Sequence, residues 1–275
     1  MSYPQLRALM EAAYGTAPAD AELEWWLDRN PVGSQLLVED EKGADGTYLA
    51  PVAVGGDERL AAFVVHAVTA PDARGQGVFS RLQRTNEEWA REAGATLALG
   101  FTTEAATRVL TGKLGWELIA RPRVWARIRL PRRGRLRGEE IAGFDARHEV
   151  RELDGPAHLL KDAPWLEWRY RDSPRPYRLV ESRRGWAVVG IGRHGGLVAG
   201  AICELRGGLG VLRRAVRACS ARAVFALPNR GEERLYAAAA FFPTPWRLHF
   251  VGRSLDPEVA LPREWRLSLG DTDFF

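Results

Sequence analysis

Cysteine is scarce in this 275-residue sequence, and long apolar runs are missing. Cys203 and Cys219 have a spacing that matches no zinc motif, and two cysteines are too few for a disulfide framework. No apolar stretch approaches the roughly 18 residues that a membrane helix needs, and Arg7 interrupts the N-terminal segment where a signal peptide has its apolar core. We therefore expect a reduced, cytoplasmic globular protein without a membrane segment or a bound metal.

The overall composition excludes several classes of non-globular protein. Hydrophobic residues make up 46% of the sequence and charged residues 27%, which does not fit a disordered, collagen-like or coiled-coil chain. A length of 275 residues exceeds what one ordinary domain needs and suits two domains of similar size. We expect either two buried cores or one large core.

Charge is divided unevenly along the chain. Residues 1–120 contain 10 basic and 17 acidic side chains, a net charge of −7, whereas residues 121–275 contain 29 and 18, a net charge of +11. The basic half could attract an anionic partner, of which nucleic acid is the obvious candidate. However, only Lys42, Lys113 and Lys161 are lysines, so an arginine-favouring genome explains the same excess. Because no nucleic-acid-binding motif is visible, nucleic acid is the least favoured partner.

The spacing of apolar residues predicts alternating helices and strands in the first half of the chain. Leu60–Thr69 is the longest apolar strand candidate, as expected for a central strand that is covered on both faces. A polar turn is expected from Glu39 to Gly46. The predicted helices lie at 3–14, 20–30, 77–93 and 104–114, and the predicted strands lie at 34–38, 47–54, 60–69 and 96–101, with a hairpin formed by 116–119 and 124–130. This order predicts an α/β fold with a mixed sheet.

The second half repeats the order of strand, glycines, helix, strand, helix and strand. Arg206-Gly207 follows Arg74-Gly75 at an offset of 132 residues, which indicates two copies of one unit. The stretch 131–138 (PRRGRLRG) has no apolar periodicity and is the best linker candidate. We therefore predict a first domain at 1–131, an arginine-rich linker at 132–144 and a second domain at 145–275.

One glycine-rich loop has the arrangement of an anion site. A strand, then Gly75 and Gly77, then a helix is the order in which backbone N–H groups and a helix N-terminus meet a phosphate. Two glycines are weak evidence, because a structural turn would contain them as well. A dinucleotide fingerprint requires a third glycine where this chain has Ser80, and the nucleotide-binding pattern G-x-x-x-x-G-K-[ST] is missing too.

The residues around this loop carry a more specific signal. VTAPDARGQGVFSRL (68–82) followed by LALGFTTEAATRVLTGKLGW (97–116) resembles the acetyl-CoA-binding core of the GNAT superfamily of N-acyltransferases. That family has the pattern V-x-P-x-x-R-G-x-G, a helix, a strand, and a short helix ending in K-x-G-F or K-L-G-W. The resemblance covers most of 60–130. In the second half, RGGLGV (206–211) resembles a degenerate copy that lacks glycine at the fourth position.

The resemblance implies how the chain holds acetyl-CoA or a longer acyl-CoA as its co-substrate. Backbone N–H groups from Gln76 to Phe79 are expected to hold the pyrophosphate, with Arg74 fixing the loop. Phe79 stands where the family usually has Gly or Ala. Family members splay the strand before the loop from the next strand, which leaves backbone groups near Val68 for pantetheine and for the oxyanion. The implied cofactor-binding residues are Val68, Thr69, Arg74, Gly75, Gln76, Gly77, Val78, Phe79 and Thr103.

The acid and base of the transfer are harder to assign. Direct transfer needs an uncharged amine and a proton for the departing thiolate. In the family a Tyr commonly supplies this proton, but this chain has Thr111 at the corresponding position. In relatives, the catalytic bases lie on the strand before the loop. This chain has Val65 and Phe63 at those positions. His66 is the titratable residue on that strand, but strand alternation puts it on the other face unless a bulge shifts the register. Glu104 begins a helix near the expected thioester, where it is either an acid or a partner of the helix dipole.

The C-terminal residues offer another source of a base. WRLSLGDTDFF (265–275) contains Asp271 and Asp273 and ends in two phenylalanines, the last with its terminal carboxylate. Some tandem GNAT-like proteins place their C-terminal carboxylate in the active site, so Asp271, Asp273 or Phe275 is a candidate base. A frayed acidic tail is the alternative, although the two aromatic residues favour docking.

The resemblance predicts an enzyme that moves an acyl group from acyl-CoA to a primary amine. The small amine acceptor is not identified by the sequence, and transfer to a hydroxyl or to a natural-product amine is an alternative. A non-catalytic CoA-binding sensor or scaffold is a further alternative, because Thr111 is a poor acid and the strand base is missing. The sequence does not indicate the oligomeric state.

Overall fold

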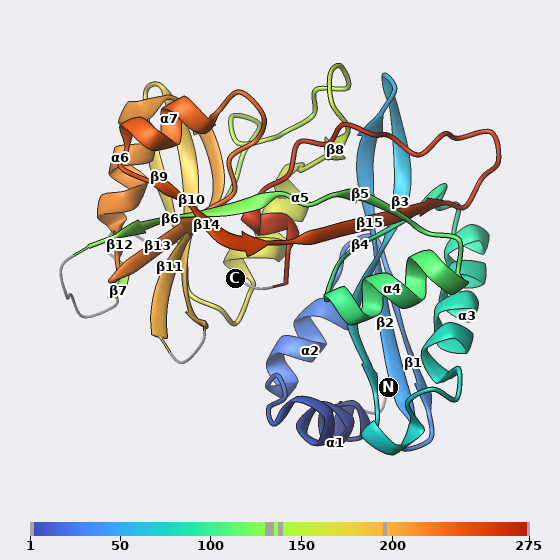
Figure 1. The fold of residues 1–275 in the computed structure, drawn as a ribbon. Coiled ribbons are helices and arrows are strands. Elements are labelled where there is room, and N and C mark those ends of the chain that lie inside the picture. Colours follow the sequence, from blue (N-terminus) through green and yellow to red (C-terminus); the bar gives the residue numbers. More distant parts are fainter. Residues whose placement is uncertain (1–2, 130–134, 137–139, 195–196, 274–275) are drawn as a thin grey trace. The chain divides into compact units, whose positions relative to one another are not determined.

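The computed structural model describes residues 3–129, 135–136, 140–194 and 197–273 (Figure 1). The chain divides into two compact units that are interleaved in the sequence. Unit 1 consists of residues 1–120, 152–160 and 249–264, and unit 2 consists of residues 121–151, 161–248 and 265–275. Residues 132–134 and 137–139 of the expected linker lie outside the described residues, but Arg135–Leu136 forms the short strand β7 and pairs with β12 (Cys219–Ser220).

Unit 1 contains a seven-stranded mixed sheet with helices packed on it. The strand order is β1-β2-β3-β4-β15-β5, with β8 paired to β2. Its helices are α1 (Tyr3–Tyr14), α2 (Asp20–Leu27), α3 (Val78–Glu92) and α4 (Glu104–Lys113). Its strands are β1 (Ser34–Glu39), β2 (Gly43–Val54), β3 (Asp57–Thr69), β4 (Leu97–Thr102), β5 (Glu117–Ala120), β8 (His158–Leu159) and β15 (His249–Ser254). A 3-10 turn, η1 (Pro71–Ala73), follows β3.

Apolar residues on β3 and α3 explain how the core of unit 1 forms. The strand β3 has buried or half-buried side chains from Arg59 onward, as expected of a central strand, and α3 buries one face while its charged residues other than Glu87 lie on the outer side. Glu87 of α3 is buried because it accepts hydrogen bonds from Trp116 Nε1 at 2.8 Å and Arg253 Nη1 at 3.0 Å. The packed α3 therefore fixes the position of the loop that precedes it.

The strands β3 and β4 separate within the sheet of unit 1. Their parallel pairing runs only from Ala61–Leu97 to Phe63–Leu99, although both strands continue beyond it. The free part of β3 also contains a bulge: Gly46 of β2 faces Val65, but Ala44 faces Val68, so that β3 has an additional residue between them. The sheet thus leaves backbone groups of β3 unpaired toward β4, next to the glycine-rich loop.

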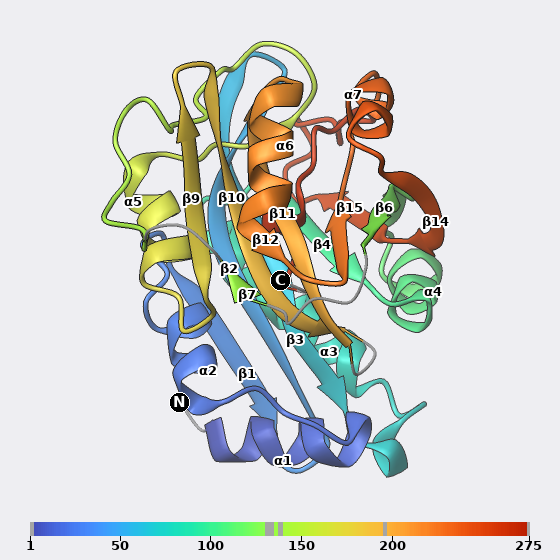
Figure 2. The ribbon, with the colours of Figure 1, turned by 90° about the vertical axis from the view of Figure 1, so that its left-hand side faces the viewer.

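Unit 2 contains a six-stranded mixed sheet in the order β14-β6-β13-β11-β10-β9. Figure 2 shows α6 lying across this sheet, over the strands β9, β10 and β11 that it contacts. The strands of this sheet are β6 (Arg123–Ile128), β9 (Tyr177–Ser182), β10 (Gly185–His194), β11 (Leu197–Gly207), β13 (Ala223–Ala226) and β14 (Phe242–Arg247). The helical segments are α5 (Ala163–Leu166), η2 (Glu167–Arg171), α6 (Leu209–Ala218), α7 (Glu233–Ala238) and η3 (Leu269–Asp271).

The two sheets exchange one strand each, which the sequence does not predict. The strand β15 comes from the second half of the chain but lies between β4 and β5 in the sheet of unit 1. The strand β6 comes from the first half but lies between β13 and β14 in the sheet of unit 2. The predicted hairpin of 116–119 with 124–130 is therefore wrong, because β5 and β6 belong to different sheets. The equivalent insertion in both sheets supports a duplicated unit.

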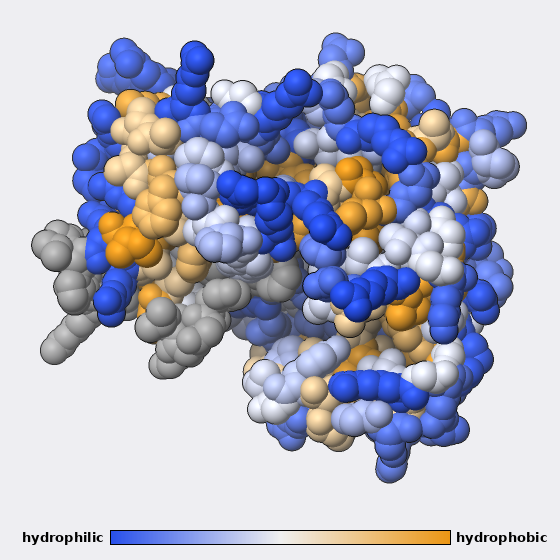
Figure 3. All heavy atoms as spheres, in the orientation of Figure 1, coloured by the Kyte–Doolittle hydropathy of each residue, from blue (hydrophilic) through white to orange (hydrophobic). Residues whose placement is uncertain are grey.

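The predicted α/β fold with mixed sheets is confirmed. The expected polar turn is shorter than predicted, because β2 begins at Gly43 and its Asp45 is fully buried. Hydrophilic residues cover most of the face drawn in Figure 3, with smaller apolar areas between them. Among the described residues, no helix combines the length and the apolar character that crossing a membrane requires.

Candidate active site

Two left-handed glycines shape the loop that leads into α3. Gly75 and Gly77 have φ values of +81° and +79°, in the left-handed region that glycine enters without strain. Gly77 is the N-cap of α3 and has no side-chain capping bond, and the helical hydrogen bonds begin with Arg81 N–H donating to the Gly77 carbonyl at 3.0 Å. The N–H groups of the first turn of α3 are thus left without acceptors inside the helix.

Arg81 holds this loop from the side of the helix. Its guanidinium donates to the Gln76 carbonyl at 2.9 Å and forms an ion pair with Glu39 at 2.6 Å. The Gln76 side chain donates in turn to the Asp72 carbonyl at 2.9 Å. These contacts keep the backbone of the loop in one shape, so that its N–H groups present a fixed set of donors.

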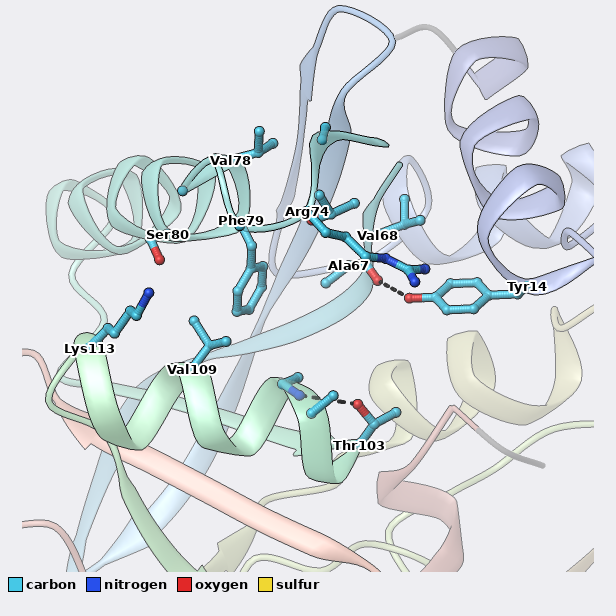
Figure 4. A pocket seen from close by; sticks show the side chains of 16 residues that line it. Tyr14, Ala67, Val68, Arg74, Val78, Phe79, Ser80, Thr103, Val109 and Lys113 are labelled. Carbon is cyan, nitrogen blue, oxygen red and sulfur yellow. Dashed lines mark hydrogen bonds between the residues drawn. The ribbon is translucent and has the colours of Figure 1, made fainter. Parts of the chain in front are cut away.

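A cavity of about 440 Å³ lies directly at this loop. Its walls come from the end of α1, the end of β3, the loop, the first turn of α3 and one side of α4 (Figure 4). The lining residues are Tyr14, Ala67, Val68, Thr69, Ala73, Arg74, Gly75, Gly77, Val78, Phe79, Ser80, Thr103, Ala105, Ala106, Val109 and Lys113. The cavity therefore has a largely apolar wall with a few polar and charged groups.

The charged groups lie at two ends of the cavity. Figure 4 shows the Phe79 ring pointing from α3 toward Val109 of α4, with Lys113 and Ser80 on one side of it and Arg74 and Tyr14 on the other. A cation at each end, with a ring between them, suits an elongated ligand that carries negative charge and has an apolar part.

The residues predicted to bind the cofactor gather at this cavity. Val68, Thr69, Arg74, Gly75, Gly77, Val78, Phe79 and Thr103 all line it. Gln76 is exposed and is not among the lining residues. Thr103 has a structural role as well, because its side chain caps α4 by accepting a hydrogen bond from Ala106 N–H at 3.3 Å.

His66 lies at the bulge of β3 but does not line the cavity. Its φ of +55° is unusual for a residue with a side chain, and its side chain is buried edge-on against Trp26, with ring centroids 6.2 Å apart. The bulge that could change the face of His66 is therefore present. It turns the His66 side chain toward Trp26 of α2 and not into the cavity.

The α4 candidates lie outside the cavity lining. Glu104 is exposed and forms an ion pair with Arg108 at 2.5 Å, as an acidic residue in the first turn of a helix commonly does. Thr111 is also exposed, and its hydroxyl donates to the Thr107 carbonyl of the same helix at 2.8 Å. Neither residue provides an acid on the wall of the cavity.

The C-terminal candidates lie in unit 2. The Asp271 side chain is almost fully buried, and its Oδ1 is 2.6 Å from Lys161 Nζ, which is also 2.6 Å from Glu204 Oε1. The Asp273 carbonyl accepts from Arg175 at 2.7 Å. Asp271 thus serves as a partner of a buried cation, while Phe275 lies outside the described residues.

In unit 2, the C-terminal segment lies beside the strand that corresponds to β3. The pairing of β11 with β13 stops at Ala201–Phe225, although β11 continues to Gly207. Gly270 lies against this continuing part, where an added Cβ would meet the Cys203 carbonyl at 3.1 Å. The part of β11 that corresponds to the cavity wall of unit 1 is therefore covered by the chain itself.

Three cavity residues with polar tips, Tyr14, Ser80 and Lys113, were not among the cofactor-binding residues predicted from the sequence. Lys113 belongs to the quoted KLGW motif, so the motif contained a signal for its position beside the cofactor loop. Tyr14 ends α1 and donates a hydrogen bond to the Ala67 carbonyl at 3.1 Å, 53 positions away in the sequence. No local pattern connects those two residues, because only the packing of α1 on the sheet brings them together.

Within the described residues, no group of three or more His, Cys, Asp or Glu side chains is placed to hold a metal ion. Both cysteines are buried, and burial raises the pKa of each thiol to about 12. Neither thiol is therefore ionised near neutral pH.

Residues 2–119 match the family model described as "Acetyltransferase (GNAT) domain". The chain is similar in fold to a GCN5-related N-acetyltransferase from Kribbella flavida, with 17% identity over 92% of this chain and 68% of that one and a TM-score of 0.60. It is also similar to Eis1 from Mycobacterium abscessus, with 16% identity over 92% and 71% of the two chains and a TM-score of 0.57.

A third similar structure is a protein from Enterococcus faecalis described as a probable N-acyltransferase, with 12% identity over 92% and 70% of the two chains and a TM-score of 0.58. At these identities the likeness shows the fold alone. A comparison with curated proteins finds no match.

Proposed function

Since residues 2–119 match the family model of a GNAT acetyltransferase domain, we propose that this protein transfers an acetyl group, or another acyl group, from acyl-CoA to a primary amine by direct attack. The observation that carries the proposal is the cavity of about 440 Å³ at the glycine-rich loop. Its lining contains almost all of the residues expected to bind CoA. A structural turn would contain left-handed glycines as well, so the cavity beside the loop is what supports a bound ligand.

The first turn of α3 is the proposed site of the CoA pyrophosphate. The N–H groups of Gly77, Val78 and Phe79 lie at the positive end of a 15-residue helix whose start is uncapped by a side chain. Arg74 and Lys113 add positive charge at the two ends of the cavity. Because unit 1 is acidic overall, these local groups rather than the net charge would bind the anion.

The unpaired part of β3 is the proposed site of pantetheine and of the thioester. Backbone groups near Val68 and Thr69 are not used by β4, so they are available to an extended ligand that runs along the strand. An N–H group there would stabilise the negative charge that develops on the carbonyl oxygen when the amine attacks. An uncharged amine then forms the C–N bond while the C–S bond breaks.

The general base of the reaction remains a proposal. Asp273 and the terminal carboxylate of Phe275 are the C-terminal candidates, because Asp271 already forms an ion pair with Lys161 inside unit 2. His66 and Glu104 are weaker candidates, since neither lines the cavity. The amine could also arrive uncharged from solution, which requires no base on the protein.

Acetyl-CoA consumption with a panel of amines, measured beside CoA binding by calorimetry, tests the proposed function. The panel should include small amines, amino alcohols and peptides with a free N-terminus, so that transfer to a hydroxyl or a larger natural-product amine is detected as well. Acceptor-dependent release of free CoA supports the proposal. CoA that does not bind at all would contradict it.

A non-catalytic CoA sensor is the second candidate function. It is favoured by Thr111, which stands where relatives are expected to have an acid and whose hydroxyl donates to a carbonyl of its own helix. A sensor requires the loop and the cavity but no group that transfers protons. Tight CoA binding together with no turnover on any acceptor would favour the sensor over the enzyme.

A further inference from the structure

The phenol of Tyr14 lies at the wall of the cavity. Tyr14 is the last residue of α1, and its hydroxyl donates to the Ala67 carbonyl at 3.1 Å (Figure 4). Ala67 belongs to the bulged part of β3 between Val65 and Val68, which is also the part that β4 leaves unpaired. The hydroxyl is thus held beside the backbone where the thioester is proposed to bind.

Tyr14 is the one lining residue that can act as a neutral acid near neutral pH. The two basic lining residues, Arg74 and Lys113, are cationic side chains and not neutral acids. The lining hydroxyls of Thr69, Ser80 and Thr103 are alcohols, which are far weaker acids than a phenol. Thr111 is not part of the lining.

Tyr14 is 56% exposed, and the partial burial of its phenol raises its pKa above the ordinary value, whereas the positive charge of Arg74 lowers it. The net shift is upward, so the phenol keeps its proton at neutral pH and can donate it. The nearby charge of Arg74 then favours the phenolate once the proton has left.

Building on the proposed function, we propose that Tyr14 is the general acid that protonates the departing CoA thiolate. The hydrogen bond to Ala67 marks the resting position of its hydroxyl, and a ligand amide that donates to the same carbonyl would release the phenol toward the sulfur. An acid on α1 would thereby replace the acid that α4 lacks at Thr111.

The proposed step conserves atoms and charge. The amine nitrogen forms a bond to the thioester carbon, the C–S bond breaks, and its electron pair goes to sulfur, which takes the phenolic proton of Tyr14. The acylated nitrogen gives up its extra proton through water to the phenolate. The products are an amide and free CoA, and Tyr14 is restored to its starting form.

The experiment compares Tyr14→Phe with Tyr3→Phe, which makes the same change on the same helix at a residue outside the cavity lining. Both variants are assayed with acetyl-CoA and with its selenoester analogue, acetyl-seleno-CoA. A selenolate is a much weaker base than a thiolate, so it leaves with little need of an acid. CoA affinity is measured for each variant by calorimetry.

We expect Tyr14→Phe to reduce kcat with acetyl-CoA by about 10²- to 10⁴-fold, with CoA affinity changed only a few-fold. With the selenoester the loss should be below about tenfold. Tyr3→Phe should retain its rate with both substrates. In the wild type, kcat should fall at alkaline pH as Tyr14 ionises, and this fall should be absent in Tyr14→Phe.

Two results would overturn the role of Tyr14. The first is an unchanged kcat in Tyr14→Phe, and the second is an equal loss with both substrates, which would assign the residue to binding or positioning. Either result leaves the proposed function intact, because the wild type would still transfer acetyl groups. A wild type that binds acetyl-CoA but acylates no amine would overturn the proposed function, and the role of Tyr14 with it.

Discussion

Lys161 Nζ lies 2.6 Å from Asp271 Oδ1, and both side chains are almost fully buried in unit 2. Glu204 is the second carboxylate on this ammonium, also at 2.6 Å, and Tyr170 donates to the same Glu204 oxygen at 2.6 Å. The two carboxylates raise the pKa of Lys161 even though burial lowers it, so the ammonium stays charged. This cluster attaches the C-terminal segment to β11.

Replacing Lys161 with Met should destabilise the protein strongly. The change leaves Glu204 and Asp271 buried without their cation, and breaking a buried ion pair from one side typically costs about 3–5 kcal/mol. Denaturant unfolding followed by tryptophan fluorescence measures this loss. Arg147→Met, which breaks an exposed pair with Asp145 in the same unit, is the control and should cost below about 1 kcal/mol. Equal losses of stability in the two variants would show that the buried position of the Lys161 ion pairs does not make them more important than an exposed pair.

Asp45 should make stability depend on pH. Its carboxyl is fully buried and accepts a hydrogen bond from Asn86 Nδ2 at 3.0 Å. Burial raises the pKa of Asp45 to about 8, the hydrogen bond from Asn86 opposes the rise, and the nearby Glu87 adds to it. The folded protein therefore holds a proton that the unfolded chain releases near pH 4, so that stability falls by about 1.4 kcal/mol per pH unit up to pH 8.

Asp45→Asn removes this titration and should flatten the stability profile between pH 5 and pH 8. The variant should be more stable than the wild type at pH 8, where the wild type has either to bury a charge or to unfold. Urea unfolding at several pH values provides the measurement, with the exposed Asp57→Asn as the control. Parallel profiles for the wild type and Asp45→Asn would show that Asp45 does not titrate in this way.

Local patterns predicted most of the elements of this fold. The helix at 3–14, the strand ending at Thr69 and the helix starting after Gly77 follow from apolar spacing and from glycine, and the structure has each of them. Asp45 was expected in a turn, since Asp and Gly favour turns. It is instead in β2, because α3 supplies Asn86 as a buried partner.

Strand partners and the far wall of the cavity could not be predicted. Nothing in the sequences of the strands β5, β6 and β15 determines which sheet each one joins. The GNAT-like motif predicted the loop, the end of β3 and Thr103 as cavity residues, because all of them lie within the motif itself. Tyr14 has no such spacing, since its contact with Ala67 depends on how α1 packs.

Gly77→Ala should weaken CoA binding. A side chain at φ +79° costs about 1–2 kcal/mol, and the added Cβ would lie 3.3 Å from Arg81 Nη1, which holds the loop. We expect the loop to change shape and the affinity for CoA to fall about tenfold, a difference of about 1.4 kcal/mol. Calorimetric titration with CoA measures this change.

Gly112→Ala is the matched control for this variant. Gly112 lies in α4, and a Cβ there meets no atom within 4 Å, so alanine should leave CoA affinity unchanged and raise helix stability slightly. If Gly77→Ala binds CoA as tightly as Gly112→Ala does, the left-handed glycine is not needed for the loop to hold its ligand.

Deleting residues 274–275 tests whether the terminal carboxylate acts as the base. A chain that ends at Asp273 retains the Lys161–Asp271 ion pair and the hydrogen bond from Arg175 to the Asp273 carbonyl, so its melting temperature should stay close to that of the wild type. If the carboxylate of Phe275 accepts the amine proton, kcat should fall about 10²-fold or more, since the group has moved by two residues. Phe275→Ala, which keeps the carboxylate in place, should retain most of the rate. An unchanged kcat in the shortened chain would exclude the terminal carboxylate, whereas a deletion from Asp271 onward would be uninformative because it also breaks the buried ion pair.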